Sequence, residues 1–196
     1  MSDDLYVPPP PKKDTRQIAM LLAFAAAACM LFGAFSRQWL VNGNKYLEYG
    51  FGLRSNFECS TSYDDQKRCE DHPNSEVVDM FEKMDPKMAS GAFVPTGWIT
   101  FISILLAALG LLGAGAMAAA KRPMDLPVAP TTIGLLFSMI ALITGCVFVA
   151  TKPGPPGMVG VGLSFWLFGV GSVMGILGSQ LLAKVNRPPD AEWTVD

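Results

Sequence analysis

The sequence has few charged residues. Only 16% of its 196 residues are Asp, Glu, Lys or Arg, whereas soluble domains usually carry about a quarter. Charge is almost absent from four blocks, which are residues 18–36, 97–120, 131–150 and 158–183. Each block is long enough to cross a hydrocarbon core of roughly 30 Å as a helix. This length disfavours the alternative, a large all-helical soluble core, because soluble buried helices are usually shorter and keep a polar face.

Reactive residues are also scarce. The chain has one histidine, His72, no Cys-x-x-Cys pair, no basic cluster and no ionisable side chain in the middle of an apolar block. Intramembrane charges usually mark proton relays, ion paths or catalysis, and no nucleophile, base and orienter can be assembled around one histidine. We therefore expect a non-enzyme without catalytic residues, cofactor, metal site, nucleic-acid partner or small-molecule substrate. The expected partners are membrane lipid and other membrane proteins, or a second copy of the chain.

One long polar segment, residues 37–95, separates the first two apolar blocks. Apolar and polar residues alternate loosely from Trp39 to Phe57, which predicts short strands, and Asn42-Gly43 favours a hairpin turn. Residues 71–74 predict a break in regular structure. Apolar residues spaced as on one helix face then predict a short amphipathic helix over 75–84, with Asn74 or Ser75 as its N-cap. The segment is expected to fold as a small antiparallel β-sheet cap.

The four cysteines divide into two pairs. Cys29 and Cys146 lie in apolar blocks, where cysteine usually serves as a packing residue. Cys59 and Cys69 lie in the polar segment, where they can staple neighbouring strands. Metal binding is the alternative, but only His72 is near enough in sequence to complete a site. A disulfide is favoured, which requires that the segment face an oxidising compartment.

The predicted fold class is a membrane all-α four-helix bundle with a small extracytoplasmic antiparallel β-sheet cap. The four-span membrane domain covers residues 17–187, with spans at 17–36, 96–120, 131–150 and 158–183. A disordered proline-rich tail, 1–16, precedes it and a polar tail, 188–196, follows it. Small residues at spacings of four allow helices to approach closely in lipid, and this pattern assigns Gly171, Gly175 and Ser179 to a helix-packing face.

Basic residues indicate the orientation. Those next to the spans gather at one set of ends: Lys12, Lys13, Arg16, Lys121, Arg122, Lys184 and Arg187. Basic residues mark the cytoplasmic ends of spans. The chain is therefore expected in a plasma or inner membrane, with both termini cytoplasmic and residues 37–95 on the other side.

The order of motifs resembles a known family. Trp39, Gly52-Leu53, Cys59 and Cys69, followed by the start of the fourth span at residues 161–167, are similar to the claudin and peripheral myelin protein-like superfamily of four-span proteins. The chain departs from the family pattern at Arg54, where the family has Trp, and in the longer gap before Cys59.

The resemblance implies a structural, adhesive or barrier role through contacts of the cap, with Trp39, Phe51, Leu53 and Phe57 as apolar contacts. The alternative is an auxiliary subunit of a channel, transporter or larger membrane complex, bound through the helix faces. The acids of the polar segment form either a solvated surface or a cation-attracting patch beside a pore. They are Asp64, Asp65, Glu70, Asp71, Glu76 and Asp79.

Overall fold

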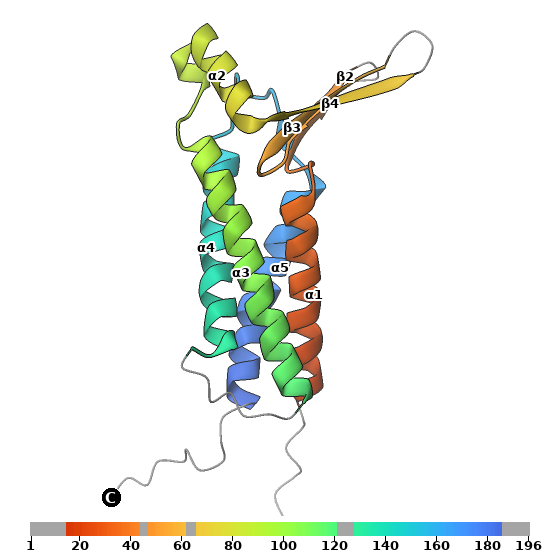
Figure 1. Cartoon of the computed structure of the whole chain (residues 1–196), viewed down its shortest axis with the longest axis vertical. Helices are drawn as coiled ribbons and strands as arrows, with labels where there is room; N and C mark the ends of the chain where they lie inside the picture. Colours follow the sequence, from red (N-terminus) through yellow and green to blue (C-terminus); the bar gives the residue numbers. More distant parts are fainter. Residues whose placement is uncertain (1–14, 44–46, 62–65, 121–127, 186–196) are drawn as a thin grey trace, which may run out of the picture.

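The computed structural model describes residues 15–43, 47–61, 66–120 and 128–185. This part of the chain forms five α-helices, one short 3-10 helix and a five-stranded sheet (Figure 1). In chain order the elements are α1 (Arg16–Phe35), β1 (Leu40–Gly43), β2 (Leu47–Phe51), β3 (Ser55–Thr61), β4 (Lys67–Pro73), α2 (Asn74–Met84), η1 (Pro86–Met88), α3 (Phe93–Ala119), α4 (Pro130–Ala150), β5 (Gly160–Val161) and α5 (Leu163–Val185). The proline-rich tail, the basic residues at 121 and 122, the acids at 64 and 65, and the last eleven residues lie outside the described ranges.

Four of the helices are long and apolar. Helices α1, α3, α4 and α5 have 20, 27, 21 and 23 residues, and at about 1.5 Å per residue each can cross a bilayer core. They stand side by side as one bundle (Figure 1). The prediction of four apolar helices is confirmed, with α3 beginning three residues earlier than expected.

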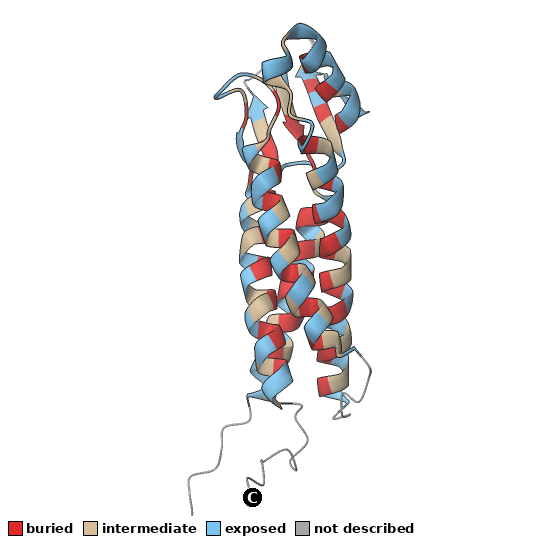
Figure 2. Cartoon of the chain, turned by 90° about the vertical axis from the view of Figure 1, so that its left-hand side faces the viewer, coloured by how far each residue is buried: buried red, intermediate tan, exposed pale blue. Residues whose placement is uncertain are grey.

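The outside of the bundle is as apolar as its inside. On α5, Leu163, Trp166, Val170, Val173 and Leu177 recur at helical spacing, and each is about half exposed or more. Buried residues instead run along the inner faces of the helices (Figure 2). A helix that is apolar all round belongs in a large core or in lipid. Because these side chains are exposed, the chain is a membrane protein.

Small residues bring the helices into contact. A Cβ atom at Gly110 on α3 would lie 2.5 Å from the backbone nitrogen of Gly134 on α4, so the two backbones nearly touch there. Between α3 and α4, Thr100 Oγ1 also donates a hydrogen bond to Thr144 Oγ1 at 2.8 Å. Close backbone approach of this kind increases dispersion contact, which stabilises helix association where lipid offers no hydrophobic driving force.

The sheet lies at one end of the bundle, and its strand order is β4-β3-β2-β1-β5 with all neighbours antiparallel. The prediction that the fourth span begins at residue 158 is wrong, because the last strand of the sheet, β5, lies there. Residues 158–162 are not helical, because Gly160 and Val161 pair with Val41 and Leu40 to form β5. Gly162 N then donates to Trp39 O at 2.8 Å. We call the five strands together with α2 the cap.

Helix α2 follows β4 without a break. The predicted interruption at residues 71–74 is wrong, because β4 continues through Pro73, and an edge strand tolerates proline. The predicted N-cap is also wrong. Asn74 is the first residue of α2, and its side-chain nitrogen donates to Gly52 O at 3.0 Å instead of capping the helix. The amphipathic helix itself is confirmed, with Val78 and Phe81 buried.

Candidate functional site

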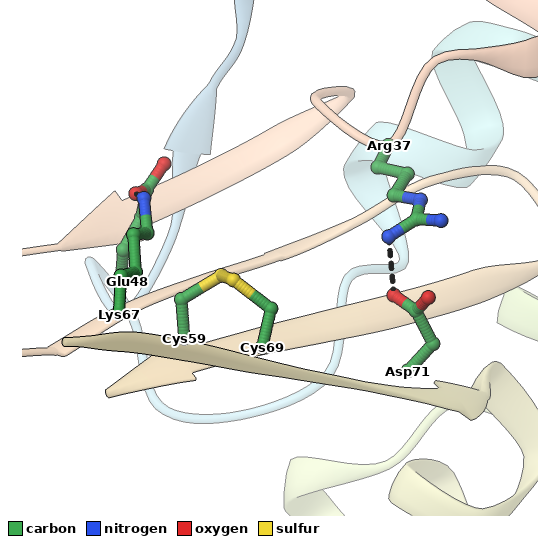
Figure 3. Close-up of a disulfide and its surroundings, with 6 residues drawn as sticks. All are labelled: Arg37, Glu48, Cys59, Lys67, Cys69 and Asp71. Atoms are coloured by element: carbon green, nitrogen blue, oxygen red, sulfur yellow. Dashed lines mark hydrogen bonds and ion pairs between the residues drawn. A yellow bond between two sulfur atoms is a disulfide. The ribbon is translucent and has the colours of Figure 1, made fainter. Parts of the chain in front are cut away.

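A disulfide joins the edge strand β4 of the cap to its neighbour β3. Cys59 on β3 and Cys69 on β4 are direct cross-strand neighbours with Cα atoms 4.0 Å apart, and their sulfurs are bonded (Figure 3). This confirms the predicted bridge. Every residue of β4 is exposed, so the strand buries little apolar surface of its own. A cross-link that restricts the unfolded chain therefore contributes a large share of what holds β4 in place.

Two ion pairs lie near the disulfide. Arg37 Nη1 is 2.8 Å from Asp71 Oδ1, and Lys67 Nζ is 2.6 Å from Glu48 Oε2 (Figure 3). All four side chains are largely exposed, so each pair contributes little to stability. They do change the charge of the surface. Because Asp71 is paired with Arg37, at least one acid of the predicted patch is compensated by a cation.

Trp39 packs the cap against the bundle. The residue is completely buried, and its indole N–H donates to Gly33 O on α1 at 2.5 Å. Its ring centroid lies 4.8 Å from that of Phe168 on α5 and 5.8 Å from that of Phe148 on α4. One side chain at the start of the sheet thus touches three of the four long helices.

The Gly52-Leu53 pair has a similar role. A Cβ atom at Gly52 would lie 2.9 Å from Ser36 O, so a larger residue would push the sheet away from the end of α1. Leu53 is 2% exposed, and Gly97 on α3 leaves room for its carbonyl. These motif residues therefore position the cap on the helices.

The apolar contacts expected for a partner protein are not available. Trp39, Phe51, Leu53 and Phe57 are at most 6% exposed. A Cβ atom at Gly50 would lie 2.8 Å from the ring of Phe57, so this ring covers the glycine. Phe51 packs edge-on to Phe93, and the two ring centroids are 5.5 Å apart. The assignment of these four residues as partner contacts is wrong, because the bundle and the sheet itself cover them.

Arg54 takes an unexpected place beside the helix aromatics. Its guanidinium carbon lies 4.3 Å from the centroid of Phe101 and 5.8 Å from that of Trp98. A cation over an aromatic face is attracted by the ring quadrupole. Arg54 thus contacts α3 with its planar group, at the position where the resembled family has a tryptophan.

The predicted packing face is oriented toward three different helices. A Cβ atom at Gly171 would lie 2.8 Å from Cys29 Cβ on α1, and one at Gly175 would lie 2.8 Å from Ser138 Oγ on α4 and 3.1 Å from Leu111 on α3. Ser179 is buried. A Cβ atom at Gly134 on α4 would lie 2.9 Å from Ser179 Oγ. The row therefore lies at the centre of the bundle.

Sequence reasoning missed a cavity. A space of about 420 Å³ lies between one face of the sheet and α2. Its lining combines apolar side chains with two glutamates, an asparagine and the single histidine: Leu47, Tyr49, Phe51, Asn56, Glu58, His72, Glu76, Val77, Met80, Phe81 and Met158. The alternation along β2 and β3 assigns these residues to one face, but the sequence does not show that α2 stands off that face.

Comparisons with known proteins add no relative. No family model matches the chain, and no curated protein matches its sequence. Within the described ranges there is no group of three or more His, Cys, Asp or Glu residues arranged to hold a metal ion. The functional assignment therefore depends on the geometry of the chain itself.

Proposed function

We propose that this protein is a claudin-like, non-enzymatic integral membrane protein that acts through protein contacts of its cap, in a structural, adhesive or barrier role. The observation that supports it most is the junction at Trp39, which contacts three of the long helices. A cap fixed in this way is a rigid platform. Rigid surfaces bind partners with little loss of conformational entropy.

The proposed contact surface lies at the outer part of the cap. Met80 and Met84 on α2 are 51% and 62% exposed, and methionine is frequent on adaptable binding surfaces. Strand β4 forms the edge of the sheet. An edge strand offers unpaired backbone groups to a partner strand. These features replace the buried aromatic residues as the proposed contacts.

The proposed orientation places the termini in the cytoplasm and the cap on the other side, in a plasma or inner membrane. Two observations support it. Arg16 is the first residue of α1 and Lys184 lies in the last turn of α5. These two helix ends lie at the end of the bundle opposite the cap (Figure 1), and basic residues favour the cytoplasmic side. The Cys59–Cys69 bond needs an oxidising compartment to form and persist.

A mixed-cell assay tests the adhesive role. Cells producing a fluorescent version of the chain are mixed with cells that produce a second colour or none. We expect enrichment at contacts only where both cells carry the protein, and less enrichment for Met84→Arg. The matched control is Leu163→Arg on the bundle, which places a charge outside the cap. Even distribution over the cell surface at all contacts would contradict adhesion.

The second candidate is an auxiliary subunit that binds a larger membrane protein. Helix α4 favours this candidate, since only 28% of an 18-residue apolar stretch of this helix is buried. This is the smallest buried share among the four long helices. Leu136, Met139, Ile143 and Val147 form an exposed row on this helix. Such a row contacts either lipid or another protein.

Cys146 offers a direct test, because this native thiol is exposed on α4. Thiol-directed crosslinking in the native membrane, followed by mass spectrometry, should recover one stoichiometric larger protein if the second candidate holds. Crosslinks between copies of the chain alone would favour the first candidate. Either role is contradicted by a turnover that survives purification and is lost on changing one polar residue.

A further inference from the structure

Strand β4 leaves one edge of the sheet open, since it pairs with β3 on one side and is the last strand of the sheet among the described residues. Cys59 and Cys69 lie opposite each other with Cα atoms 4.0 Å apart, the close spacing of a non-hydrogen-bonded antiparallel pair. Five residues later, Asn74 N donates toward β3, to Arg54 O at 3.2 Å. Both observations indicate that the odd-numbered residues of β4 direct their N–H and C=O groups away from β3.

The open edge therefore carries usable backbone groups. Lys67, Cys69 and Asp71 each direct one N–H and one C=O outward, and such a row is a template for another strand. Pro73 belongs to the same set but has no N–H, so it costs the ladder to β3 nothing. A partner strand is thus limited to residues 67–71.

The side chains along this edge change sign at its middle. Lys67 and Arg68 precede Cys69, and Glu70 and Asp71 follow it. An antiparallel second copy of the strand, centred on Cys69, places every basic residue opposite an acidic one. Registers centred on Arg68 or on Glu70 instead place two like charges opposite each other, which is unfavourable. Charges that usually protect an edge from pairing here select one register.

Glu70 also has an unfavourable neighbour in its own chain. It lies directly opposite Glu58 on β3, and like charges in this arrangement repel. His72 Nε2, 3.8 Å from Glu70 Oε2, compensates the charge only when it is protonated. Arg68 makes no ion pair within the described residues. In the register centred on Cys69, Arg68 of the second copy lies beside Glu70, so each copy supplies the cation that the other lacks.

We propose that β4 pairs with β4 of a second copy of this chain, antiparallel and with Cys69 opposite Cys69. Three hydrogen-bonded residue pairs with two bonds each give about six backbone bonds. The two-fold axis of such a self-complementary pair is perpendicular to the sheet. Because β4 runs across the end of the bundle (Figure 1), this axis follows the bundle and both copies stand in one membrane. The inference rests on the proposed protein-contact function, since it names the partner of one surface of the cap.

Exchange of charge at two residues tests the proposal on the full chain in detergent micelles. Energy transfer between donor-labelled and acceptor-labelled chains measures the dissociation constant of the pair. Arg68→Glu and Glu70→Arg should each weaken self-pairing at least about tenfold, because each places like charges opposite each other twice. An equal mixture of the two variants should regain the wild-type dissociation constant, and so should the double variant, since opposite charges again face each other. Lys67 and Asp71 stay unchanged because they hold ion pairs within the chain.

The matched controls are Lys87→Glu and Glu82→Arg, which change charge by the same amount at exposed positions outside the sheet. Both should pair like the wild type. An intact Cys59–Cys69 bond and an unchanged melting temperature show that each variant is folded. Wild-type pairing by folded Arg68→Glu, or a double variant that does not regain pairing, would overturn the proposal.

The mixed-cell assay separates this inference from the proposed function. Enrichment at cell contacts without any pairing of the wild-type chain would refute the strand pairing and leave the contact role of the cap in place. Charge-dependent pairing without enrichment at cell contacts would support the strand pairing and contradict adhesion.

Discussion

Trp39 shows how much one side chain can decide in this molecule. Its backbone pairs with the sheet, since Trp39 N donates to Phe51 O at 3.1 Å. Its indole ring instead contacts the helices, through a hydrogen bond to Gly33 O and through rings from α4 and α5. Indole suits this place because it combines a large apolar surface with one donor that must be satisfied when buried. The cap and the bundle therefore share one core.

Replacing Trp39 with alanine should separate these two parts. We expect Trp39→Ala to lower the free energy of unfolding by about 3–5 kcal/mol, the usual cost of removing a buried aromatic side chain. Unfolding in detergent, followed by circular dichroism, measures the change. Trp166→Ala is the control, since Trp166 is 62% exposed on α5 and its loss should cost far less. Equal losses in the two variants would contradict the account.

Gly171 allows a second comparison within one helix. A side chain there would collide with Cys29 and Met30 on α1, whereas nothing lies within 4 Å of a Cβ built at Gly169. Gly171→Leu should therefore destabilise the bundle by about 1–3 kcal/mol through overpacking. Gly169→Leu should be neutral or stabilising, because leucine has the higher helix propensity. Thermal unfolding in detergent distinguishes them, and a matching shift in both variants would show that Gly171 faces lipid.

Some of these residues could be predicted from the sequence and others could not. Spacing alone identified Gly171, Gly175 and Ser179, because small residues four apart have few uses in an apolar helix other than close packing. The aromatic residues of the sheet were misassigned to a partner surface. Alternation along a strand shows which residues share a face, but it does not show which neighbouring element covers that face.

Among the elements, β4 depends most on a covalent bond. It is an edge strand with all residues exposed, joined to β3 by backbone pairing and by Cys59–Cys69. Its charged residues discourage uncontrolled pairing with other chains. The four helices, by contrast, bury a shared core that does not include the bridge.

Removing the bridge should loosen the cap and leave the bundle folded. We expect the Cys59→Ala, Cys69→Ala double variant to lose about 2–4 kcal/mol of cap stability, as is typical of a native disulfide. Limited trypsin digestion, followed by mass spectrometry, should then show faster cleavage after Lys67 and Arg68, with the long helices still protected. Cys146→Ala is the control and should digest like the wild type. Unchanged cleavage of the double variant would mean that β4 is held by pairing alone.

The short elements were the hardest to predict. β5 has two residues, and the sequence around it, with Gly160, Val161 and Gly162, continues the apolar pattern of the fourth span. Only pairing with β1, more than a hundred residues earlier in the chain, makes it a strand. Residues 71–74 were read as a break for the opposite reason: local proline and asparagine signals were overridden by the register of β4 on β3.

The overall architecture could be predicted from composition more directly than the individual elements could. Four long blocks without charge predict four apolar helices, and the structure has them, although the fourth block begins with β5. The exposed apolar outer faces of these helices identify lipid as the surrounding medium. The cavity could not be foreseen, since it arises from the distance at which α2 crosses the sheet.

The central claim is that the four helices cross a membrane and hold the cap on the side opposite the chain ends. Two variants test it, each with one added cysteine at an exposed site. The first is Lys87→Cys beside the cap, and the second is Lys184→Cys near the end of α5. A membrane-impermeant maleimide is applied to intact cells and then to broken cells, with the wild-type chain as the background for Cys29 and Cys146. The account predicts that the Lys87→Cys variant is labelled in intact cells and that the Lys184→Cys variant is labelled only after the cells are broken. Equal labelling of both variants in intact cells would contradict it.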